Sequence, residues 1–135
     1  MCGDDGCKVS TVVSKAYSGL FMADKFVIVR RCTELLHWLV PKSEAFPRAQ
    51  RFLLTQRLMA SAFDCHDAII EAQSYRSAAR IDALQRADSA LSRLRAYLAM
   101  VHELQWLNQR QYQHVSRMVL EIGKLLGGWL KQSQQ

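Results

Sequence analysis

The residue types that most often perform chemistry stand close together at few places in this chain. Glu34 and His37 form a Glu-x-x-His step, which carboxylate-bridged dimetal bundles require on two helices. No second copy of the step occurs in the sequence, and its helical spacing places both side chains opposite the apolar stripe of their helix. The pair is therefore predicted to face water, and we expect no metal site and no cofactor.

A second cluster is the sequence Asp-Cys-His-Asp at residues 64–67. Hydrolytic catalysis needs a base directed at a nucleophile, but the spacing places His66 on the apolar side of its helix and the aspartates away from it. A structural histidine is the favoured interpretation. Cys2 and Cys7 resemble the start of a metal motif that no nearby Cys or His pair completes. Because no phosphate-binding loop or nucleophile elbow occurs either, we expect no catalytic residues and no enzymatic activity.

Arginine carries most of the positive charge of the sequence. Against 12 Asp+Glu stand 18 Lys+Arg, of which 12 are Arg, so the formal net charge is +6 over 135 residues. An excess of cations favours an anionic partner, and guanidinium groups suit bidentate contacts with phosphate or carboxylate. The alternative is a solvated face with local ion pairs, such as Asp82 with Arg86. The candidate binding residues are Arg48, Arg51, Arg76, Arg80, Arg86, Arg93 and Arg110.

The elements that must position these arginines are helices. From Asp24 onward the hydrophobic spacing follows the α-helical period, and it predicts helices over residues 24–40, 47–73, 77–105 and 111–131. Asp24 is the expected cap of the first helix, Pro41 its end, and Pro47 the opening of the second. The second helix is expected to bury Phe52, Met59, Ala62, Phe63, Ile69 and Ile70.

The third predicted helix carries the spacing of a bundle seam. Its apolar residues step by three and four positions, and the fourth helix follows the same rhythm. Four amphipathic helices with short links predict an all-α, up-down-up-down four-helix bundle over residues 24–132. Residues 1–23 are expected to be a flexible or loosely helical extension, and residues 133–135 a tail. Since no signal peptide or bilayer-length apolar segment is visible, we expect a cytoplasmic protein with no membrane association.

The last predicted helix contains a Gly-x-x-x-Gly step at Gly123 and Gly127. A glycine inside a helix costs about 1 kcal/mol relative to alanine, so we expect another helix, within or between subunits, to pack closely against this face. Aromatic residues nearby are candidate anchors of the same contact. They are Tyr97, Tyr112 and Trp129.

Two segments resemble the accessory variability determinant (Avd) proteins of diversity-generating retroelements. The sequence WLVPK at residues 38–42, with FPR at residues 46–48 and RF at residues 51–52, is similar to the first connector of that family. The sequences LNQRQY at residues 107–112 and EIGKLLGGWLK at residues 121–131 are similar to its last helix. The resemblance extends over about residues 31–132.

The resemblance implies a four-helix bundle assembled as a homopentameric barrel without a catalytic site. It also implies association with the reverse transcriptase of the element and with its template-repeat RNA or an RNA/DNA hybrid, in support of mutagenic retrohoming. A related family, encoded within intervening sequences of 23S ribosomal RNA genes, is similar in fold and pentamer. A structural or RNA-associated pentamer without a reverse transcriptase is therefore the alternative, although the Leu-Gly-Gly-Trp sequence at residues 126–129 favours the retroelement group.

The charge pattern agrees with an RNA-binding role. In an up-down bundle, one end would gather Lys42, Arg48, Arg51 and Arg110, and the other Lys25, Arg76, Arg80 and Lys131. Repetition in an oligomer would turn either cluster into a basic ring. Because few aromatic residues accompany these cations, we expect contacts with phosphates or acidic protein surface and little sequence preference.

Overall fold

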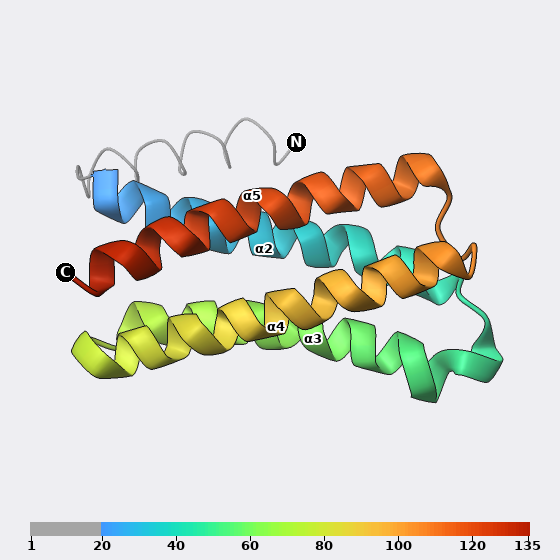
Figure 1. The fold of residues 1–135 in the computed structure, drawn as a ribbon, viewed down its shortest axis with the longest axis horizontal. Coiled ribbons are helices and arrows are strands. Elements are labelled where there is room, and N and C mark those ends of the chain that lie inside the picture. Colours follow the sequence, from blue (N-terminus) through green and yellow to red (C-terminus); the bar gives the residue numbers. More distant parts are fainter. Residues whose placement is uncertain (1–19) are drawn as a thin grey trace, which may run out of the picture.

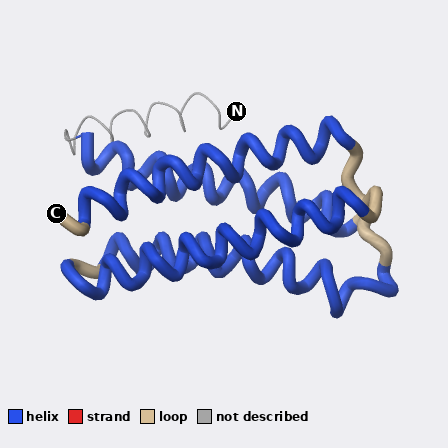
Figure 2. The backbone as a smooth tube through the Cα atoms, in the orientation of Figure 1, coloured by secondary structure: helices blue, strands red, loops and turns tan. Residues whose placement is uncertain are grey.

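The computed structural model describes residues 20–135, which form four long helices and no strand (Figures 1 and 2). The helices are α2 (Leu20–Glu44), α3 (Gln56–Ser74), α4 (Ser77–Glu103) and α5 (Gln109–Ser133). Successive helices run in opposite directions, and α2 packs against both α3 and α5 (Figure 1). The predicted all-α bundle is confirmed for the described residues. Most of the predicted N-terminal extension, with Cys2 and Cys7, lies outside them.

The core follows the stripes that the sequence predicts for three of the helices. The seam of α4 is buried along its whole length, at Leu84, Ala87, Leu91, Leu94, Leu98 and Val101. It belongs to one core cluster with the buried stripe of α2, at Ile28, Cys32, Leu35 and Leu39, and with that of α5, at Val115, Val119, Ile122, Leu126 and Trp129. The heptad-like spacing therefore defines the packing faces of these helices correctly.

Helix α2 is longer than predicted at both ends. It begins at Leu20, so Asp24 is not its cap, and it continues through Pro41 to Glu44. A proline removes one helical hydrogen bond, but Pro41 is exposed and stands one turn from the end of the helix. The extra turn brings Phe46 into the core, where its ring lies 5.3 Å from the ring of Trp106. This burial offsets the cost of the proline.

The second predicted helix is not a single α-helix. After Pro47 the chain forms a tight 3₁₀ turn, η1 (Arg48–Gln50), then a wide π-type turn, η2 (Arg51–Thr55), and only then α3. Of the predicted core residues, Ala62 and Ile69 are buried, Met59 is half-buried, and three are wrong because they are exposed: Phe52 (80%), Phe63 (43%) and Ile70 (40%). The buried face of α3 consists mainly of small side chains, at Leu58, Ser61, Ala62, Cys65, Ala68, Ile69 and Ala72.

Two buried thiols join α2 to α3 in the core. Cys32 and Cys65 are free cysteines, and the thiols interact by a hydrogen bond. This hydrogen bond, together with burial, raises the pKa of the Cys32 thiol far above its ordinary value. Cys32 is therefore held protonated in the folded chain.

The turn between α4 and α5 fixes where α5 begins. Gln105 adopts a positive φ of 66°, and the amide of Trp106 donates to the carbonyl of Val101 over 2.9 Å. The side chain of Asn108 then accepts from the Gln111 amide (2.8 Å), while the side chain of Gln111 accepts from the Asn108 amide (2.9 Å). This reciprocal capping box satisfies two amides that a helix start leaves free. It starts α5 at Gln109, two residues earlier than predicted.

Candidate anion-binding groove

A basic groove lies between α2 and α5, near the start of α5. It encloses about 430 Å³ and has six lining residues, none of them acidic. They are Trp38 and Lys42 from α2, and Arg110, Gln111, His114 and Arg117 from α5. We call this surface the basic groove.

Aromatic contacts hold the α2 side of the basic groove in place. The ring of Trp38 is half-buried, and its centroid lies 5.5 Å from that of His114. The Nζ atom of Lys42 also lies 5.5 Å from the centroid of Trp38, within the range of a cation–π interaction. A histidine and a lysine from different helices are thus placed by one tryptophan.

The cations of the basic groove have no acidic partner among residues 20–135. No carboxylate of the described residues forms an ion pair with Lys42, Arg110 or Arg117. Arg110 also stands in the first turn of α5, where the helix macrodipole disfavours a cation and favours an anion. Both features make the groove electrostatically suited to a phosphate or carboxylate group.

The other cations predicted at this end of the bundle lie outside the basic groove. Arg48 and Arg51 are exposed on the turns η1 and η2. Arg51 lines a neighbouring recess, which also contains the acidic residue Glu44. Of the candidates predicted from the sequence, only Arg110 therefore lines the groove.

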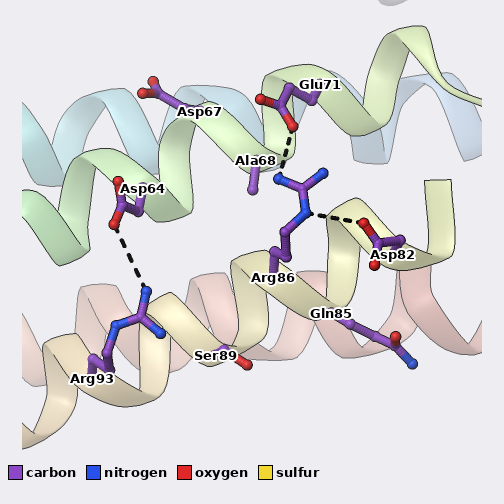
Figure 3. Close-up of a pocket in the computed structure, with 9 residues that line it drawn as sticks. All are labelled: Asp64, Asp67, Ala68, Glu71, Asp82, Gln85, Arg86, Ser89 and Arg93. Atoms are coloured by element: carbon purple, nitrogen blue, oxygen red, sulfur yellow. Dashed lines mark hydrogen bonds and ion pairs between the residues drawn. The ribbon is translucent and has the colours of Figure 1, made fainter. Parts of the chain in front are cut away.

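Two predicted arginines lie instead between α3 and α4, in a groove of about 430 Å³ that is lined by four carboxylates (Figure 3). Arg86 forms ion pairs with Glu71 (2.9 Å) and Asp82 (3.1 Å), and the hydrogen bond to Glu71 is the main cause of the raised pKa of Arg86. Arg93 lies 3.8 Å from Asp64. Because carboxylates of the chain offset their charge, these arginines are poorly placed to attract an anion.

The remaining predicted arginines lie at the opposite end of the bundle. Arg76 is exposed and stands at the N-cap position of α4, where its side chain forms no capping hydrogen bond. Arg80 donates from Nε to the carbonyl of Ala72 (3.0 Å), and its guanidinium lies 5.8 Å from the ring centroid of Trp129. Arg80 therefore links α4 to α3 and packs over Trp129, so it stabilises the bundle.

The acidic cluster on α3 differs in one detail from its prediction. His66 is half-buried, as expected for a structural histidine. However, Nδ1 of His66 lies 3.0 Å from Oδ1 of Asp67, so this carboxylate turns toward the ring instead of away from it. Within the described residues, no group of three His, Cys, Asp or Glu side chains is arranged to hold a metal ion.

The aromatic residues predicted as contact anchors already pack inside the chain. Tyr97 and Tyr112 are half-buried against the core, and Tyr112 stacks on His102 with ring centroids 4.2 Å apart. Trp129 is buried. At Gly123 the guanidinium of Arg95, from α4, lies where a Cβ atom would be, although this flexible side chain could move aside at little cost.

Sequence reasoning missed four residues of the basic groove, which are Trp38, Gln111, His114 and Arg117. A signal was present in the sequence, because positions 110, 114 and 117 are spaced to share one face of a helix. What the spacing could not show was that this face borders α2 beside Trp38.

Fold and site together define a four-helix bundle with a basic groove between its first and last described helices, and no described helix is apolar over a length that could span a membrane. A sequence model of the bAvd-like family matches residues 26–133. The chain belongs to this family, which confirms the resemblance to the Avd proteins of diversity-generating retroelements.

Comparison with solved structures supports the same fold. The bundle is similar to the crystal structure of a protein of unknown function from the S23 ribosomal protein family of Bacteroides thetaiotaomicron VPI-5482. The TM-score is 0.74 at 21% sequence identity, over 80% of this chain and 98% of that one. No curated protein sequence matches the chain.

Proposed function

We propose that the chain is a non-enzymatic accessory protein of a diversity-generating retroelement, which binds the reverse transcriptase and the template RNA and so supports mutagenic reverse transcription. Membership of the bAvd-like family supports the accessory role. The observation that carries the RNA-binding part is the basic groove, in which Lys42, Arg110 and Arg117 have no acidic partner among the described residues.

In this proposal the basic groove takes phosphate groups of the RNA backbone. Three cations and a histidine around 430 Å³ match a phosphodiester better than an apolar ligand. The protein works as a homo-oligomer, a pentamer as in the family that it resembles, so that several copies of the groove contact one RNA. Such repetition raises the overall affinity without new types of contact.

A pentamer that associates with ribosomal RNA and has no reverse transcriptase partner is the second candidate. The similarity to a structure from the S23 ribosomal protein family is the observation that favours it. That likeness is one of fold. The matching family model covers residues 26–133 of this chain and favours the retroelement function.

Co-purification with the reverse transcriptase encoded beside the gene tests the proposal. We expect the tagged chain to retain the enzyme and its template RNA at low salt. The matched variant Lys42→Ala/Arg110→Ala/Arg117→Ala should lose the RNA, whereas Arg86→Ala/Arg93→Ala should keep it. Absence of both partners from the wild-type sample at low salt would contradict the proposed function.

A further inference from the structure

Two surfaces on opposite corners of the bundle are unexplained by the basic groove. The first lies on α3 and the turn before it, where apolar side chains at intervals of seven and four residues share one face of the helix. Phe52, Phe63 and Ile70 are exposed there and Met59 is half-buried. We call these residues the α3 stripe. Exposed apolar side chains gathered on one face are typical of a surface that contacts another protein.

The second surface lies on α5 and is formed by Leu120, Lys124, Gly127 and Lys131, which we call the α5 stripe. Leu120 is 52% exposed, and neither lysine forms an ion pair with the described residues. None of the described residues would come within 4 Å of a Cβ at Gly127 or at the following Gly128. These glycines destabilise the helix relative to alanine, and the bundle shows no contact that uses the space they leave.

The two stripes lie at matching heights along the bundle. Helix α3 ends at Ser74, and after a two-residue turn α4 starts at Ser77. Ser77 lines one recess together with Ser133, the last residue of α5. The ends of α3 and α5 are therefore at the same level, and both helices run toward this end (Figure 1).

Counting back from these ends gives a register between the stripes. Phe63 stands 11 residues before the end of α3, and Leu120 stands 13 before the end of α5. The same two-residue offset, about 3 Å of helix rise, relates two further pairs. These are Asp67 with Lys124, and Ile70 with Gly127.

Each pair in this register is chemically complementary. In this register Phe63 would face the exposed Leu120, and Ile70 would face Gly127, whose missing side chain leaves room for a bulky one. The carboxylate of Asp67 is exposed, and His66 is its one ion-pair partner among the described residues. In this register it would face the amino group of Lys124. Contacts between different patches of two identical chains are heterologous. Because the paired residues differ in height by only about 3 Å, such a contact can repeat with little step along the bundle axis, which favours a closed ring.

We propose that the α3 stripe of one copy of this chain docks on the α5 stripe of a second copy, with Phe63 against Leu120, Asp67 against Lys124 and Ile70 against Gly127. The inference rests on the oligomer proposed above and names the surfaces that form it. Neither stripe shares a residue with the basic groove, so this contact uses none of the residues that line the groove.

Light scattering of the full chain, with size-exclusion separation, tests this contact. The wild type should have a mass several times 15.4 kDa. Gly127→Leu fills the open space, so it should preserve the helix content yet raise the dissociation constant of the oligomer at least about tenfold. Lys124→Asp should also shift the chain toward the monomer, and Lys124→Asp/Asp67→Lys should restore the oligomer. Leu104→Asp is the control, because Leu104 is exposed but belongs to neither stripe.

The possible results separate the contact from the proposed function. A wild-type oligomer whose mass is unchanged in Gly127→Leu and Lys124→Asp overturns the contact and leaves the proposed function standing. A monomeric wild type overturns both the contact and the proposed oligomer. An assembled chain that responds to the variants as expected but binds no RNA supports the contact and contradicts the proposed function.

Discussion

The ring of His114 lies 5.5 Å from the ring of Trp38, and this contact joins α5 to α2 at the basic groove. The same tryptophan holds Lys42 through a cation–π interaction, with Nζ 5.5 Å from the ring centroid. Trp38 is thus the residue through which the helix packing positions two of the groove's basic side chains. Replacing Trp38 therefore changes the shape of the groove without removing any of its charges.

Trp38→Ala is expected to weaken RNA binding about two- to fivefold, because Lys42 and His114 lose the surface that orients them. Trp38→Phe keeps a ring at this position and should retain most of the affinity. Fluorescence anisotropy with a labelled template RNA measures both. Wild-type affinity in Trp38→Ala would show that the ring does not organise the groove.

The ion pairs of Arg86 and Arg93 are expected to stabilise the packing of α3 against α4 slightly. They are exposed to solvent, so the stability difference between wild type and Arg86→Ala/Arg93→Ala should be small and should shrink at high salt. RNA affinity should not fall. Urea denaturation at low and high salt gives the first result, and a marked loss of RNA binding would show that these arginines are ligand-binding residues after all.

The thiol of Cys32 should make stability depend on alkaline pH. Its pKa is raised in the folded chain by the hydrogen bond with Cys65 and by burial. A raised folded-state pKa contributes stability that is fully present below the unfolded value, about 8.5, and is lost as the pH rises above it. Between pH 8.5 and 9.5 the wild type should lose more unfolding free energy than Cys32→Ala, by up to about 1.4 kcal/mol. Equal losses under reducing conditions would refute this.

Leu58 and Leu53 should differ sharply in their contribution to stability. Leu58 is fully buried, so Leu58→Ala should cost about 2–5 kcal/mol. Leu53 is exposed on the turn η2, and Leu53→Ala should cost about 0.5 kcal/mol or less. Chemical denaturation checks both. Similar losses would contradict the burial of Leu58 and the exposure of Leu53.

Periodicity was sufficient to predict the buried faces of α2, α4 and α5, because each has a single apolar stripe. Helix α3 has two apolar stripes with helical spacing, one around Phe63 and one around Cys65. The stripe of small residues is the buried one, since small side chains let α3 pack closely against its neighbours, and the bulkier aromatic stripe stays outside. Hydrophobicity alone therefore predicts the wrong buried face for α3.

The basic groove could be predicted only in part for a similar reason. The spacing of Arg110, His114 and Arg117 defines one face of α5, but the rotation of α5 against α2 depends on core packing between residues far apart in sequence. The sequence also favoured Arg86 and Arg93 as binding residues. Their carboxylate partners Glu71 and Asp64 lie on the neighbouring helix, and spacing along the sequence does not reveal such tertiary contacts.

The salt dependence of RNA binding tests the central claim most directly. For single-stranded RNA the slope of log K against log salt concentration is about −0.7 per phosphate contact. Lys42→Ala/Arg110→Ala/Arg117→Ala should therefore make the slope shallower by about 2 per groove engaged and lower the affinity at low salt, while Arg86→Ala/Arg93→Ala keeps the wild-type slope. The opposite pattern, with an unchanged slope in the groove variant, would contradict the assignment of the basic groove as the RNA-binding surface.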